Sequence, residues 1–265
     1  YLWEKVLAKD SFMEIVQKYL HLQIIKDKKG VKTKEIMIFP RYHQLDVVTK
    51  LLADVKTNGV GKNYLIQHSA GSGKSNSIAW LAHQLAGLHD NHDENIFNSI
   101  IVLTDRRVLD AQLQDTIYQF DHVAGVVKKV KNGSKELLEA INSDTKIIIS
   151  TLQKFPLIYK DITSDNKNFA IIVDEAHSSQ SGKDAGTVIK GLANLEETLK
   201  EYADIEGKKE LSKEDSEDLL IKTLAAQGNH KNLSFFAFTA TPKAKTLNRF
   251  GERQPDGTFK PFHIY

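Results

Sequence analysis

Four short apolar runs punctuate the chain: Tyr64–Gln67, Ile100–Leu103, Phe169–Val173 and Leu233–Phe238. Hydrophobic and polar positions do not alternate within Phe169–Val173, which therefore predicts a strand buried on both faces, as in a parallel sheet. Between the runs, apolar residues recur at helical spacing. One such helix carries Leu45, Val48, Leu51 and Leu52, and another spans 75–88 with Ile78, Ala79, Leu81, Ala82 and Leu85. This alternation of strands and helices predicts an α/β domain with a mostly parallel central sheet.

The first 38 residues differ in pattern from the rest. Ser11–Glu14 reads as a capping box, and the apolar positions that follow predict a helix with one apolar face. Lys26–Gly30 is typical of a turn, and Val31–Phe39 predicts a hairpin or an edge strand. We interpret residues 1–38 as a helical connector.

A glycine-rich loop lies between the Tyr64–Gln67 strand and the following helix, the context expected of a phosphate-binding loop. Its glycines allow close approach of the backbone, and the helix adds the positive end of its dipole. Lys74 would reach the β- and γ-phosphates, and Ser75 would bind a phosphate-bound Mg²⁺. His68 stands where the usual pattern begins with glycine, and an ordinary loop is the alternative. The residues predicted to bind nucleotide are Ala70, Gly71, Ser72, Gly73, Lys74 and Ser75.

Two adjacent acids, Asp174 and Glu175, follow the apolar run Phe169–Val173. Ligands of open parallel sheets bind beyond the carboxyl ends of the strands, where the phosphate loop also lies. We therefore expect Asp174 to hold Mg²⁺ through its water shell and Glu175 to orient and deprotonate the attacking water. A solvated strand end is the alternative.

The last apolar run ends in a Thr-Ala-Thr-Pro turn formed by Thr239, Ala240, Thr241 and Pro242. With the phosphate loop and the Asp-Glu-Ala-His box, this turn makes the chain resemble the first motor lobe of superfamily two helicases and translocases, from about Phe39 onward. The resemblance implies a three-layer RecA-like domain that binds ATP and Mg²⁺. It also implies that Thr239, Ala240 and Thr241 couple nucleotide to motion.

Flanking segments resemble one branch of that superfamily, the motor (R) subunit of type I restriction enzymes. Phe39–Gln44 resembles its adenine-recognition segment, which implies that Gln44 reads the base with support from Arg41. From spacing alone, a polar residue that opens the helix is the better interpretation of Gln44. The pair Gln67–His68 is also typical of this family.

The same resemblance implies two DNA-contact segments that bind backbone phosphates without reading sequence. Residues 104–113 contribute Arg106 and Arg107, and residues 147–155 contribute Thr151, Gln153 and Lys154. An ordinary charged helix start is the alternative for the arginines.

His177, the last residue of the acidic box, would couple the nucleotide site to the threonine turn. The alternative is a hydrogen-bonded histidine at the rim of the core. Ser178 stands where the family usually carries arginine, so no role is carried over to it.

The resemblance implies a first motor lobe over residues 39–245, with the start of a link to a second lobe over 246–265. We expect a polar helical insertion at about 192–230, because Glu196–Asp218 holds ten acidic and four basic residues. That stretch has a net charge of −6 and leaves +8 on the rest of a chain whose net charge is +2. A basic body suits a polyanion. The resemblance implies that the second lobe of such a motor supplies arginines that stabilise charge on the transferring phosphate, so this piece, with one recognisable lobe, should hydrolyse ATP poorly. It also implies that residues 1–38 join the motor to an N-terminal nuclease domain, which is not recognisable in this sequence.

Composition narrows the class of protein further. The 265 residues are 41% hydrophobic, enough for one large domain. No long apolar run or signal peptide is recognisable, and the absence of cysteine excludes disulfides and cysteine-ligated zinc. We therefore expect a cytoplasmic protein without membrane contact.

The function expected from these features is that of an ATP-dependent translocase lobe acting on double-stranded DNA. As part of a type I restriction endonuclease, it would assemble with specificity and methyltransferase subunits. Another superfamily two helicase or remodeller is one alternative. A nucleotide-binding switch or scaffold that does no mechanical work is the other.

Overall fold

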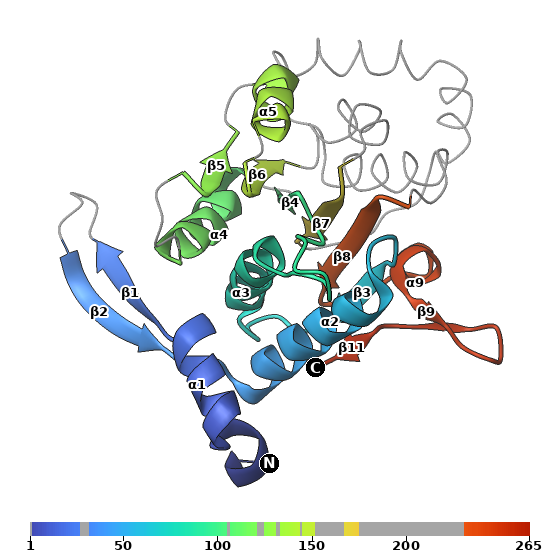
Figure 1. Cartoon of the computed structure of the whole chain (residues 1–265), viewed down its shortest axis with the longest axis horizontal. Coiled ribbons are helices and arrows are strands. Elements are labelled where there is room, and N and C mark those ends of the chain that lie inside the picture. The colour runs from blue at the N-terminus through green and yellow to red at the C-terminus, as the bar shows by residue number, and fades with distance from the viewer. Residues whose placement is uncertain are drawn as a thin grey trace.

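A parallel β-sheet lies at the centre of the computed structural model, which describes residues 2–26, 32–104, 107–120, 125–130, 133–143, 145–151, 167–174 and 231–265 (Figure 1). Within these residues the sheet has seven strands in the order β11-β3-β8-β7-β4-β6-β5, and every neighbouring pair is parallel. The strands are β3 (Tyr64–Gln67), β4 (Ser99–Thr104), β5 (Val127–Lys129), β6 (Ile147–Thr151), β7 (Phe169–Val173), β8 (Leu233–Thr239) and β11 (His263–Ile264). The predicted parallel sheet is confirmed.

Helices cover both faces of this sheet and complete three layers. One face packs against α2, α3 and α4, and the other packs against α5 and α9. The bounds of these helices are α2 (Tyr42–Asn58), α3 (Lys74–Ala86), α4 (Arg107–Gln119), α5 (Gly133–Asn142) and α9 (Ala244–Phe250). The three-layer RecA-like architecture expected from the resemblance is thereby confirmed.

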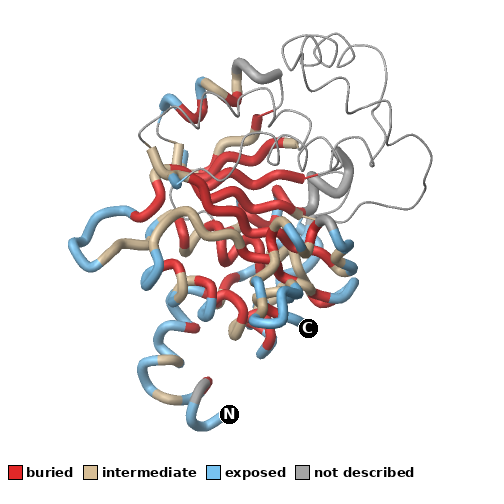
Figure 2. Tube along the Cα trace, turned by 90° about the vertical axis from the view of Figure 1, so that its right-hand side faces the viewer, coloured by how far each residue is buried: buried red, intermediate tan, exposed pale blue. Residues whose placement is uncertain are grey.

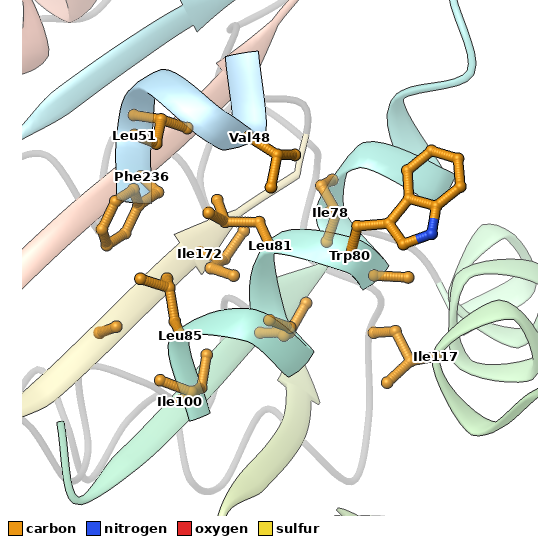
Figure 3. Packing of buried hydrophobic residues seen from close by; sticks show 14 of the residues in the cluster. Val48, Leu51, Ile78, Trp80, Leu81, Leu85, Ile100, Ile117, Ile172 and Phe236 are labelled. Carbon is orange, nitrogen blue, oxygen red and sulfur yellow. The ribbon is translucent and has the colours of Figure 1, made fainter. Parts of the chain in front are cut away.

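The strands of the sheet are buried on both faces, as their continuous apolar runs predict. In β4, Ile100 and Val102 pack on the side of α3, whereas Ile101 and Leu103 pack on the side of α5. Figure 2 shows these strands as a buried centre. Figure 3 shows side chains from α2, α3, α4 and the strands meeting in the larger of the two cores. Burial on both sides places the ends of the strands, and the loops that follow them, in fixed positions.

The N-terminal helix starts earlier than the sequence predicts. After a π-helical turn, η1 (Leu2–Val6), helix α1 spans Lys9–Lys18, and its N-cap Ala8 makes no side-chain capping bond. The predicted capping box at Ser11–Glu14 is wrong, because Phe12 N already donates to Ala8 O at 2.8 Å. The helical hydrogen bonds therefore begin before Ser11.

An antiparallel hairpin follows α1, with strands β1 (His21–Lys26) and β2 (Lys32–Ile38), so the predicted hairpin is confirmed. The chain before it is anchored to the main core. Tyr19 is 2% exposed and accepts a hydrogen bond on its carbonyl from Trp80 Nε1 at 2.9 Å. The ring of His21 lies 3.7 Å from that of Phe120. Packing therefore continues across residue 38, the predicted end of the connector.

The C-terminal segment also belongs to the packed structure. After α9 it forms a hairpin of β9 (Glu252–Arg253) and β10 (Phe259–Lys260), and then β11 adds a parallel edge strand beside β3. Lys62 links this segment to α2, since its Nζ lies 2.9 Å from Asp54 and 3.1 Å from Glu252. The sheet thus extends past residue 245, the predicted end of the lobe.

The predicted insertion at about 192–230 lies outside the described residues. None of the helices in the described part of the chain combines the length and apolarity needed to cross a membrane.

Candidate functional site

The predicted phosphate loop, called the phosphate loop below, occupies residues 68–73, between the end of β3 and the start of α3. Gly71 and Gly73 have φ angles of +79° and +82°, which residues with a side chain rarely adopt. The backbone N–H groups of Asn76 and Ser77 both point to Gly73 O, so α3 begins directly at the loop. Lys74 and Ser75 lie in its first turn and are partly exposed. Strand, glycine turn and helix follow one another as predicted, in the geometry that binds anions at a helix N-terminus.

Helix α2 braces the loop through the side chain of Gln44. Its Oε1 accepts a hydrogen bond at 2.8 Å from the backbone N–H of Arg41, the residue that caps the start of α2. Its Nε2 donates to two carbonyls of the loop, Ser72 O at 3.3 Å and Gly73 O at 3.0 Å. His43 adds a donor bond from Nε2 to Ser72 O at 2.9 Å. Both amide atoms of Gln44 therefore have protein partners. The predicted adenine contact stays a prediction, and making it would require the amide to exchange these bonds.

Replacing Gly73 with alanine should destabilise the loop more than the same change at Gly71. A Cβ at Gly73 would meet Gln44 Nε2 at 2.5 Å, whereas one at Gly71 would meet no atom of the described residues within 4 Å. Both variants pay for a positive φ, at about 1 kcal/mol, but Gly73→Ala must also displace the Gln44 amide and lose its bonds, a further 1–2 kcal/mol or so.

Denaturant unfolding of both variants measures this difference, and Gly71→Ala is the matched control. In a Gln44→Ala background the excess cost of Gly73→Ala should disappear, because the colliding amide is gone. Equal costs for the two glycines in the parent background would contradict the contact.

The predicted catalytic and coupling residues come from strands beside the loop. Gln67, at the end of β3, lies in register with Thr239 of β8, and Val173 of β7 lies in register with Ala237 of β8. Asp174 directly follows β7, and its N–H donates to Leu103 O at 3.0 Å. Two strand spacings of about 4.8 Å each separate β3 from β7 across the sheet.

The threonine turn lies between the other two parts of the site. His68 N donates to Thr239 O at 2.9 Å, and Thr241 N donates to Thr239 Oγ1 at 3.2 Å. The phosphate loop, the turn and Asp174 therefore share one edge of the sheet. Glu175 and His177 lie outside the described residues, so their roles stay predictions.

The predicted DNA contacts begin on the neighbouring strands of the same edge. Thr151 ends β6 and lies in register with Thr104, the last residue of β4, and α4 begins at Arg107. Arg106, Gln153 and Lys154 lie outside the described residues. Along the edge, candidate nucleotide residues follow β3 and β7, the predicted coupling turn lies at the end of β8 between them, and candidate DNA residues lie at or after the ends of β4 and β6.

The donor set at this edge suits a hard cation that keeps its water. Ser75 offers a hydroxyl and Asp174 a carboxylate. Mg²⁺ prefers oxygen ligands of this kind, and it usually binds only one or two of them from the protein while keeping several waters. In the part of the chain that the structure describes, no group of three or more His, Cys, Asp or Glu side chains could hold a metal.

Beneath the loop lies a buried chain of hydrogen bonds that the sequence analysis missed. His68 Nε2 lies 3.0 Å from His263 Nδ1, and His263 Nε2 lies 3.0 Å from Asp46 Oδ2. Tyr265 stacks on His43 with ring centroids 3.6 Å apart and planes 5° from parallel. Nothing in the local pattern signals these contacts, because 195 positions separate His68 from His263.

The charge states of this chain follow from its surroundings. Burial lowers the pKa of His68 to about 3, and the positive charges near it act in the same direction. Burial also lowers the pKa of His263, although Asp46 opposes the shift. Burial works against the charged form of Asp46, but hydrogen bonds from Lys50 and His263 outweigh it, and its pKa is lowered. At neutral pH, a carboxylate thus faces two uncharged imidazoles.

Comparison with known proteins places these features in a family context. Residues 43–261 match the SWI2/SNF2 ATPase family. The C-terminal part of the type I restriction enzyme MpnIIP endonuclease subunit of Mycoplasma pneumoniae is 31% identical over 190 residues, covering 67% of this chain and 85% of that protein. The MjaVIIIP endonuclease subunit of Methanocaldococcus jannaschii, also described as part of a type I restriction enzyme, is 27% identical over 215 residues. That match covers 73% of this chain but 20% of the subunit.

Among solved structures, UvsW of bacteriophage T4 is similar, with a TM-score of 0.50 and 15% identity over 97% of this chain and 38% of that one. At this identity the similarity concerns the fold alone. The chain spans a fifth or less of the length of longer relatives such as the MjaVIIIP subunit and the HindI endonuclease subunit of Haemophilus influenzae, which is 28% identical over 168 residues.

Proposed function

Because the chain belongs to the SWI2/SNF2 ATPase family and to the endonuclease subunits of type I restriction enzymes, we propose that it is their ATP-dependent translocase lobe for double-stranded DNA. Its fold is that of a helicase-like motor lobe. The observation that carries the proposal is the meeting of the phosphate loop, the threonine turn and Asp174 on adjacent strands at one edge of the sheet. That edge is where open parallel sheets bind their ligands.

In this proposal the phosphate loop binds the triphosphate of ATP. The positive φ angles of Gly71 and Gly73 shape the backbone around it, and Lys74 donates to the β- and γ-phosphates. Ser75 and Asp174 would hold Mg²⁺, largely through water. When bound, that ion neutralises charge on the phosphate oxygens. Gln44 and Arg41 would bind adenine.

Hydrolysis requires a water molecule placed in line with the γ-phosphate. We assign its orientation and deprotonation to Glu175, the residue after Asp174, since phosphoryl transfer depends on positioning and charge neutralisation. His177 and the turn from Thr239 to Thr241 would then pass the change to the DNA side. His68 N–H already joins the loop to Thr239 O, which supports a direct link between the loop and the turn.

The proposed DNA contacts are Arg106, Arg107, Thr151, Gln153 and Lys154, all at or after the ends of β4 and β6. Contacts of this type bind phosphates and leave the recognition of sequence to other parts of a complex. We therefore propose specificity and methyltransferase subunits as partners, and a cytoplasmic location. Alternating affinity for backbone phosphates would move the DNA without strand separation.

The decisive test is the ATPase rate of the natural protein with and without duplex DNA. We expect DNA to stimulate hydrolysis, and Glu175→Gln to lower the stimulated rate by about 100-fold or more while Mg-ATP still binds, because the carboxylate acts in the chemical step. Ser178→Ala is a neighbouring control.

Each alternative function predicts a different result in the same experiments. A nucleotide-binding switch would bind ATP without DNA stimulation, and a conventional helicase would unwind the duplex. Duplex unwinding by the natural protein would favour the helicase over the translocase. We expect the 265-residue chain alone to hydrolyse ATP poorly.

A further inference from the structure

The C-terminal segment contacts the phosphate loop directly at the start of the loop and reaches its other end through His43. At the start of the loop, Ser69 N donates to Tyr265 O at 2.9 Å, and His68 meets His263 through their ring nitrogens. Near its other end, Ser72 O accepts from His43, whose ring stacks on Tyr265. The loop therefore contacts two residues that follow it by almost 200 positions in the chain.

The carboxylate of Asp46 determines the direction of every hydrogen bond in the chain from α2 to the loop. An ionised carboxylate only accepts, so His263 must donate to it from Nε2. A neutral His263 then has a lone pair at Nδ1, so His68 Nε2 must donate to it. This leaves His68 Nδ1 without a proton, and that atom is buried and has no hydrogen-bond partner among the described residues. One carboxylate thereby selects the tautomers of two histidines.

We propose that Asp46, His263 and His68 form a positioning relay, through which the C-terminal strand sets the conformation of the phosphate loop and hence its affinity for nucleotide. The inference rests on the proposed function, since it concerns the same nucleotide site. Coupling between two sites is reciprocal, so nucleotide bound to the loop must also change the stability of β11 in its place beside β3.

The identity of residue 68 supports a positioning role for its side chain in addition to packing. Phosphate loops usually begin with glycine at this point, which has no side chain to reach a neighbouring strand. Here the His68 side chain is fully buried and makes a polar contact with β11. The charged groups facing the two rings are Asp46 and Lys50 from α2 and Lys74 from α3, with His43 of α2 as a further titratable neighbour.

Paired substitutions at His68 separate positioning from packing. His68→Gln keeps an amide donor near the place of Nε2, whereas His68→Gly restores the usual loop residue and removes the link. With the nonhydrolysable analogue AMP-PNP and Mg²⁺ in calorimetry, we expect His68→Gln to bind within about twofold of the parent and His68→Gly about tenfold more weakly. His263→Phe, which keeps a ring without nitrogens, should also weaken binding about tenfold. The double variant should be no worse than either single, because all three remove the same link.

A second measurement needs no nucleotide. Nitrogen-15 NMR of the imidazoles at pH 7 should show His68 and His263 neutral, both protonated at Nε2. His89→Gln, on the loop after α3, is the control and should leave binding unchanged. A proton on Nδ1 of His68, or binding by His68→Gly as tight as the parent's, overturns the relay. Absence of AMP-PNP binding by the parent chain would instead overturn the proposed function, and the tautomers would still decide the relay. If His263→Phe fails to fold, the two His68 variants decide it.

Discussion

Replacing Lys74 with alanine should weaken Mg-ATP binding about 100-fold, because the variant loses a charge-assisted hydrogen bond to phosphate worth about 3 kcal/mol. Lys74 is the first residue of α3, where the loop brings its side chain to the positive end of the helix. A cation near the N-terminus of a helix is unfavourable, so the variant loses no stabilising interaction with the helix dipole. We therefore expect its free energy of unfolding to differ from that of the parent by no more than about 0.5 kcal/mol. Calorimetry with Mg-ATP and denaturant unfolding measure the two quantities.

Lys18→Ala is the matched control for charge. It removes a lysine from α1, where Nζ pairs with Glu14 at 2.7 Å on an exposed face. If long-range attraction of the nucleotide were the cause, both variants would lose affinity. If Lys74 donates directly to phosphate, the loss should be confined to Lys74→Ala, and unchanged affinity in that variant would refute the assigned role.

The largest effect on stability should come from Trp80→Ala, at about 3–5 kcal/mol. Trp80 is fully buried in α3 (Figure 3). Its ring lies 5.6 Å from that of Tyr19 and 5.8 Å from that of Phe120. Its Nε1 also donates to Tyr19 O, so the truncation leaves a cavity and removes one of the two hydrogen bonds that this carbonyl accepts, the other coming from His21 Nδ1. Denaturant unfolding, followed by circular dichroism, measures the loss.

The chain offers a matched control in Trp3, its only other tryptophan, which is 77% exposed. Trp3→Ala should change the free energy of unfolding by less than about 0.5 kcal/mol. In that variant, fluorescence reports Trp80 alone and should shift to the red on unfolding. A cost below about 1 kcal/mol for Trp80→Ala would mean that α1 and β1 do not pack on α3 in solution.

The central elements were predictable because their signals are local. Continuous apolar runs identified β4, β7 and β8 as strands, and the Gly-Lys-Ser sequence placed the loop at the start of α3. The start of α1 was not predictable from Ser11, although that residue is a good cap. A cap forms only where the helix begins, and here the preceding turn let the helix begin at Lys9.

The roles of particular side chains near the loop depended on contacts across the fold. Gln44 fits the description of a helix opener, and it also binds two carbonyls of the phosphate loop 28 and 29 positions away. His68 looked like a departure from the loop pattern until β11 brought His263 beside it. The local sequence around His68 does not predict a partner so far along the chain.

Residue types and their spacing thus sufficed for the α/β class, for the position of the glycine turn between β3 and α3 and for the strand that ends before Asp174, because burial periodicity and turn chemistry act within a few residues of the chain. The tertiary structure alone decided the strand order that brings Gln67, Thr239 and Asp174 to one edge. It alone also joined Asp46, His263 and His68, since hydrogen bonds between distant segments exist only once the sheet and its helices have packed.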